Sequence, residues 1–151
     1  VTSFRLGRPR LEYATLHEER YVLVGAPALL ARAPLLDATG AARHTLIDAH
    51  EDLPLFRYLL DALPSRHAWT FRSTWLLGAI GAIRERVLAG DGVAVLPRYL
   101  VAGDLESGAL RAPLPETEPR SDWFRLVWRA GDPRATRLRE FAEALLDFPL
   151  R

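Results

Sequence analysis

Polar and aromatic side chains gather at three turns of the sequence, each between a strand pattern and a helix pattern. These turns are Asp48 to Asp52, Arg72 to Trp75 and Pro97 to Tyr99. In open α/β sheets small molecules bind where such turns meet, because helix N-termini present unpaired amides to anionic groups. Ser73, Thr74 and Trp75 are therefore the first candidates for ligand contact. A second interpretation stays open, in which Ser73 and Thr74 only cap a helix and Trp75 packs in the core.

The catalytic and cofactor motifs fail at defined positions. A phosphate-binding loop needs a lysine after its glycines, and the sequence has no lysine. The run from His17 to Tyr21 starts like a zinc-protease helix but has Tyr21 where the second zinc ligand must stand. Ser107 lacks the preceding glycine of a nucleophile elbow. We therefore expect no catalytic activity, no cofactor and no metal, and an enzyme is the least favoured hypothesis.

Composition and charge restrict the class of protein further. Of 151 residues, 49% are hydrophobic, which is enough for one compact domain or two small lobes with a buried core. The formal net charge of +1 gives no field that would hold a polyanion, so nucleic acid is not expected to bind this segment directly. Cysteine is absent, and no apolar run approaches the roughly 18 residues of a membrane span. These features favour a cytoplasmic protein with no membrane partner.

Hydrophobic periodicity predicts alternating strands and helices. Strands are expected at residues 1–5, 11–16, 21–24, 45–47, 69–72, 93–96 and 123–128. Helices are expected from Pro27, over 53–63, from Ser73 to about 89, over 99–105 and over 133–148. Short connections between such elements indicate an α/β fold with a mainly parallel sheet.

Two of these helices have an apolar stripe, and a third is preceded by acidic residues. The helix from Ser73 has one apolar stripe, formed by Leu76, Ile80, Ile83 and Val87, and Gly90 ends it. The last helix has a second stripe, formed by Leu138, Phe141, Leu145 and Phe148. Adjacent Glu51 and Asp52 precede the helix over 53–63, where acidic side chains complement the positive end of the helix dipole more often than they perform acid–base chemistry.

Several segments, in this order, resemble the effector-binding domain of LysR-type transcriptional regulators. They are Leu16 to Pro27, with its acidic-basic turn and apolar strand; Ala79 to Pro97, followed by Leu105 to Leu110; and Phe124 to Arg129 before the final helix. Each motif alone is weak, but their order and spacing agree across nearly the whole chain.

The resemblance implies a two-lobed α/β fold like that of type 2 periplasmic binding proteins, with mainly parallel sheets and an effector in the cleft. Residues 1–26 would form a first-lobe segment and a crossover strand, 27–94 the second lobe, and 95–151 the return crossover and the C-terminal part of the first lobe. The first lobe would be incomplete, since the family's first strands and helices, its linker helix and its winged helix-turn-helix would precede Val1. DNA would then be bound only through that N-terminal domain.

The resemblance also implies a function and a set of contacts. The domain would sense a small metabolite, usually an organic anion in this family, and control transcription. Matching positions place these residues at the effector: Thr2, Ser3, Phe4, Gly25, His50, Glu51, Ser73, Thr74, Trp75, Val95 and Pro97. Such domains pair antiparallel, so a homodimer or higher homo-oligomer would form through Leu53 to Leu63 and Trp69 to Arg72. The alternative with the same fold is a solute-binding protein of a transport system.

Overall fold

The computed structural model describes residues 10–63 and 69–148, which form two compact units. Unit 1 comprises the residues up to Glu19 and from Ser121 onward, and unit 2 comprises Arg20–Arg120. The strand expected at 1–5, the candidates Thr2, Ser3 and Phe4, and the helix end expected at Pro64 lie outside the described residues. The predicted lobe boundaries, at 26/27 and 94/95, differ from the limits of these units, and the assignment of lobes stays a prediction.

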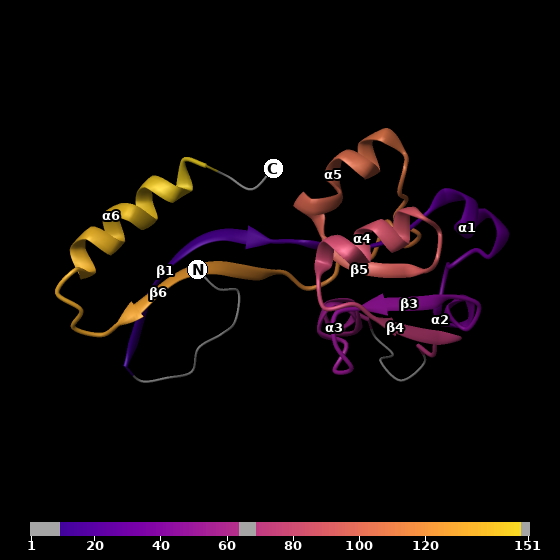
Figure 1. Cartoon of the computed structure of the whole chain (residues 1–151), viewed down its shortest axis with the longest axis horizontal. Coiled ribbons are helices and arrows are strands. Elements are labelled where there is room, and N and C mark those ends of the chain that lie inside the picture. Colours follow the sequence, from indigo (N-terminus) through magenta and orange to yellow (C-terminus); the bar gives the residue numbers. More distant parts are fainter. Residues whose placement is uncertain (1–9, 64–68, 149–151) are drawn as a thin grey trace. The chain divides into compact units, whose positions relative to one another are not determined.

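Unit 2 is built on a four-stranded sheet (Figure 1). Its strands, in spatial order, are β2 (Tyr21–Gly25), β5 (Val93–Pro97), β3 (Thr45–Asp48) and β4 (Ser73–Leu76). β5 pairs with β3, and β3 with β4, in parallel, whereas β2 pairs with β5 antiparallel. This arrangement confirms the α/β fold with mainly parallel pairing.

Helices complete unit 2 and bury the apolar strands. They are α1 (Pro27–Arg32), α2 (Ala38–Ala41), α3 (Pro54–Leu60), α4 (Ile80–Leu88) and α5 (Arg98–Ser107). α3 and α4 each pack against β2, β3 and β5. All residues of β2 and β5 are buried, as their continuous apolar runs predict. The helix predicted to start at Pro27 is confirmed as α1. Gly108 was predicted to end the helix before it, and it does end α5, with a left-handed φ of 74° that favours glycine.

The prediction that a helix starts at Ser73 is wrong, because Ser73–Leu76 is strand β4 and α4 begins only at Ile80. The strand expected at 69–72 is therefore formed four residues later, where Ser73–Leu76 pairs in register with Thr45–Asp48. Residues 69–71 instead supply aromatic packing, with the Phe71 ring 5.1 Å from that of Phe56. Ile83 and Val87 of the predicted stripe are buried, but Leu76 is an exposed strand residue whose spacing from Ile80 imitates a helical turn.

Unit 1 consists, within the described residues, of two antiparallel strands and a helix. β1 (Leu11–Glu19) pairs with β6 (Asp122–Arg129), and α6 (Ala135–Leu146) packs on both strands. β1 runs three residues beyond its predicted end. The predicted stripe of α6 is only partly covered: Leu138 and Leu145 are half-buried, whereas Phe141 and Phe148 are 54% and 76% exposed.

The described residues contain neither a helix that could span a membrane nor a group of side chains that could hold a metal ion. No helix at 10–63 or 69–148 is long and apolar enough to cross a membrane. In the same ranges, no group of three or more histidine, aspartate or glutamate side chains is arranged to hold a metal ion.

Candidate ligand-binding site

The strand register of unit 2 separates the predicted site residues into two sets at opposite ends of the sheet. At the carboxyl ends of the parallel strands lie Asp48, Leu76 and Pro97, and His50 and Glu51 follow Asp48 directly. At the other end, Gly25 pairs with Val93, and Ser73 pairs with Thr45. The structure therefore brings His50, Glu51 and the end of β4 to one edge, and places Gly25 and the start of β4 at the other.

Residues of the second set already make close protein contacts. The Ser73 hydroxyl lies 2.9 Å from that of Thr45 in a hydrogen bond. A Cβ at Gly25 would lie 3.0 Å from Cγ1 of Val93, so this glycine allows tight packing of β2 on β5. Val95 is fully buried. Contact of these residues with a ligand stays a prediction.

At the carboxyl edge, the buried carboxylate of Asp48 binds the start of α3. It accepts hydrogen bonds from the backbone amides of Ala49 at 2.6 Å, Leu55 at 3.2 Å and Phe56 at 2.8 Å. Burial raises the pKa of Asp48 above its ordinary value, and the three amides oppose that shift. The first amides of α3 are thus satisfied by the protein's own anion, and not by Glu51 and Asp52, whose side chains are exposed.

The loop between β3 and α3 holds His50 and Glu51 in exposed positions. Nδ1 of His50 lies 3.5 Å from a carboxylate oxygen of Asp52. The loop closes through a 2.9 Å hydrogen bond from the Leu53 amide to the His50 carbonyl. Leu53 has a left-handed φ of 50°, a conformation that costs about 1 kcal/mol or more for a residue with a side chain. This loop therefore has a defined, strained shape rather than an arbitrary one.

The connection from β4 to α4 is the other part of this edge, and it lies where a continuous helix was predicted. The Leu77 amide donates a 2.8 Å hydrogen bond to the Asp48 carbonyl, which fixes the connection beside β3. Trp75 and Leu76 are 44% and 48% exposed. A Cβ at Gly78 or Gly81 would have no neighbour within 4 Å. Gly78 lies in this connection and Gly81 in the first turn of α4, and glycine, which is uncommon inside helices, was the sequence signal against a continuous helix here.

The N-terminus of α4 differs from that of α3 in its electrostatics. Ala79 precedes α4 and provides no side-chain cap, and the first turn contains no acidic residue. The first amides of a helix have no partner within the helix, so this end presents positive potential without an internal anion. This arrangement suits an anionic group beside exposed apolar side chains.

Comparison with known proteins identifies relatives of one kind. Residues 1–149 match the family model described as the LysR substrate binding domain. The chain is 34% identical over 138 residues to the HTH-type transcriptional regulator AbaB of Streptomyces antibioticus, an alignment that covers 82% of this chain and 44% of AbaB. The chain thus spans less than half the length of this relative.

Solved structures of the same family share the fold. The C-terminal domains of a LysR family protein from Agrobacterium tumefaciens align with a TM-score of 0.77 and 22% identity, covering 97% of this chain and 69% of that one. CrgA, a LysR-type transcriptional regulator from Neisseria meningitidis, aligns with a TM-score of 0.76 and 22% identity, covering 97% of this chain and 50% of CrgA. These likenesses confirm the type of fold that the sequence motifs imply.

Proposed function

The chain belongs to the family of LysR substrate-binding domains, and on that premise we propose that it binds a small-molecule effector for a transcriptional regulator. The observation that carries the proposal is the match of the family model to residues 1–149. The name of AbaB as a transcriptional regulator favours this function over solute binding for transport. DNA would be bound by a helix-turn-helix in a part of the full-length protein outside this chain.

The effector site would lie at the carboxyl edge of the unit 2 sheet. Ligands of open α/β sheets bind outside the carboxyl ends of the strands. At α3 the amides are occupied by Asp48, whereas α4 has no side-chain cap and an open surface at Gly78 and Gly81. An organic anion with an apolar part would match this edge, since its charge would meet the amides of α4 and its apolar part would meet Trp75 and Leu76.

Thermal-shift screening of small carboxylates against the full-length protein tests this function. A ligand at 100 times its Kd stabilises the folded state by about 2.7 kcal/mol, which corresponds to a Tm increase of about 5 to 10 °C for a domain of this size. If no carboxylate raises the Tm and the full-length protein binds no DNA upstream of its own gene, the proposed function is wrong.

A matched pair of variants tests the place of the site. Gly81→Asp puts a carboxylate in the first turn of α4, where it favours the helix and repels an anionic ligand. Gly103→Asp adds the same charge on α5, where a Cβ also has open space. We expect the ligand-induced Tm increase to disappear in Gly81→Asp and to persist in Gly103→Asp. Equal ligand-induced Tm increases in both variants would show that the site is not at α4.

A homodimer through Leu53 to Leu63 and Trp69 to Arg72 is the corresponding proposal for assembly. Leu55, Phe56 and Leu59 of α3 are buried within unit 2, so pairing would use the outward face, where Arg57 is exposed. Arg57→Glu in the full-length protein should weaken the dimer at least tenfold, as measured by light scattering across a dilution series, because reversing a charge at an interface destroys its electrostatic complementarity. Arg98→Glu, on another exposed position, is the control and should leave the dimer intact.

Unit 1 would be completed by residues of the full-length protein outside this chain. Within residues 10–19 and 121–148 the sheet of unit 1 has two strands, which is marginal by itself, and Tyr13, Trp123 and Phe141 are 61%, 41% and 54% exposed. Further strands and helices of the first lobe would cover these side chains. In the full-length protein, quenching of Trp123 by acrylamide should therefore be weaker than in this chain, and unchanged quenching would contradict the proposal.

A further inference from the structure

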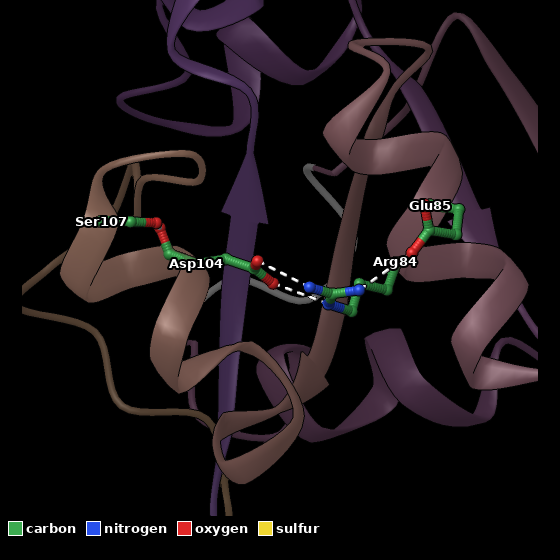
Figure 2. A network of polar contacts seen from close by, with 4 residues as sticks. All are labelled: Arg84, Glu85, Asp104 and Ser107. Atoms are coloured by element: carbon green, nitrogen blue, oxygen red, sulfur yellow. Dashed lines mark hydrogen bonds and ion pairs between the residues drawn. The ribbon is translucent and has the colours of Figure 1, made fainter.

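Two helices of unit 2 are joined by a short, bidentate ion pair (Figure 2). Nε of Arg84, on α4, donates to Oδ2 of Asp104, on α5, at 2.7 Å, and Nη2 donates to Oδ1 at 2.7 Å. The Asp104 side chain is only 12% exposed and that of Arg84 30%. The third guanidinium nitrogen reaches the exposed Glu85 at 2.9 Å. The two parallel bonds fix both the distance and the relative orientation of the guanidinium and the carboxylate, because both groups are planar.

The backbone of Asp104 connects this pair to the end of α5 and the segment beyond it. Its carbonyl accepts hydrogen bonds from the Leu110 amide at 3.0 Å and from the Ser107 hydroxyl at 3.2 Å. Leu110 is 1% exposed, so the turn is held in the core. Next to it, Arg111 and Gly25 exchange backbone hydrogen bonds of 2.9 and 3.0 Å. Asp104 therefore binds α4 through its side chain, and its backbone carbonyl binds the segment that follows α5.

We propose that the Arg84–Asp104 pair is the joint that transmits changes in α4 to residues 108–120, the segment through which the chain continues from unit 2 to β6. This bidentate pair resists stretching, since separation would leave the mostly buried carboxylate of Asp104 without its partner. A change in stability or position of α4 then alters the turn at Leu110. The use of this joint for signalling rests on the proposed effector site at α4, but the joint itself exists without ligand.

Hydrogen exchange with the unliganded chain tests the joint directly. Gly81→Ala strengthens α4, because alanine favours a helix over glycine and the added methyl group meets no atom within 4 Å. The expected result is about two- to fivefold slower exchange of the α4 amides, and a similar slowing at the Leu110 and Arg111 amides. In an Asp104→Asn background, Gly81→Ala should slow exchange in α4 only.

Two controls separate transmission from a merely structural role. Gly103→Ala strengthens α5 itself, and should slow exchange at Leu110 with or without the Asp104 carboxylate. The double variant Arg84→Gln/Asp104→Asn should disturb the Leu110 and Arg111 amides no more than either single variant, since all three remove the same pair. The joint is refuted if Gly81→Ala slows Leu110 and Arg111 equally in both backgrounds, or slows neither. Because no ligand is used, that outcome leaves the proposed function untouched.

Discussion

His44 should make unit 2 sensitive to mild acid, and its replacement by leucine should remove that sensitivity. The side chain is 1% exposed, and both ring nitrogens are buried. Burial lowers the pKa of His44 below its ordinary value, and the charges of Arg43 and Arg72 add to this effect, while the Ala33 carbonyl opposes it. The folded state therefore holds His44 neutral, packed just before β3.

The sign of the pH effect follows from the lowered pKa. Above pH 6.5, the ordinary value, His44 is neutral in both states and contributes no pH dependence. As the pH falls below that value, the unfolded chain binds a proton that the folded chain does not, so the free energy of unfolding decreases by up to about 1.4 kcal/mol per pH unit. At pH 5.5 the loss is at most about 1.4 kcal/mol, and it stops increasing once the pH falls below the lowered pKa of the folded state.

Urea denaturation at pH 7.5 and pH 5.5 measures this loss. His44→Leu keeps a similar side-chain volume and should change the free energy of unfolding at pH 7.5 by less than about 1.5 kcal/mol. Between the two pH values it should lose less stability than the wild type, by at most about 1.4 kcal/mol. His50→Gln is the control, because His50 is exposed, and should behave as the wild type. Equal acid sensitivity of His44→Leu and the wild type would refute the reasoning.

Three further substitutions have outcomes set by single contacts. Asp48→Ala leaves backbone amides at the start of α3 unpaired, so urea denaturation should show a loss of about 3 kcal/mol. A Cβ at Gly92 would collide with the Thr45 carbonyl oxygen, so Gly92→Ala should cost about 3 kcal/mol or more, whereas Gly78→Ala, in open space, should change stability by less than about 0.5 kcal/mol. Glu12 accepts hydrogen bonds from α6 and β6, and Glu12→Gln should speed hydrogen exchange in α6 by about fivefold.

Local patterns predicted two completely buried strands of unit 2 and one start and one end of its helices. The apolar runs at Tyr21 and Val93 correspond to fully buried strands, because a strand covered on both faces requires apolar side chains at every position. Pro27 and Gly108 mark a helix start and a helix end through their own backbone preferences. In these places the local signal and the packed structure agree.

Strand β4 could not be recognised from its own residues. All four residues of Ser73–Leu76 are exposed, so no alternation of apolar and polar side chains marks it. Its position is set instead by pairing with β3, a contact between residues 28 positions apart, as for Thr45 and Ser73. The exposed Leu76, four residues before Ile80, imitated a helical stripe. A tertiary contact therefore overrode a plausible local pattern.

The role of Asp48 was missed for a related reason. Three acids lie near the start of α3, and the two closest in sequence, Glu51 and Asp52, were expected to complement its dipole. The left-handed turn at Leu53 folds the chain back so that the helix starts beside the end of β3, and the more distant Asp48 reaches the amides. The distance along the sequence therefore does not show which carboxylate binds the helix amides, because the loop geometry determines it.

This difference between the two helix starts determines where an anion is favoured. An anion approaching α3 would have to displace the Asp48 carboxylate from the Phe56 amide, and would also meet the exposed Glu51 and Asp52 at the rim. At α4 it would meet a helix start with no side-chain cap and no acidic side chain in the first turn. The acidic turn before α3 is thus unfavourable for an anion. The start of α4, which was predicted to be helix interior, is the more favourable of the two.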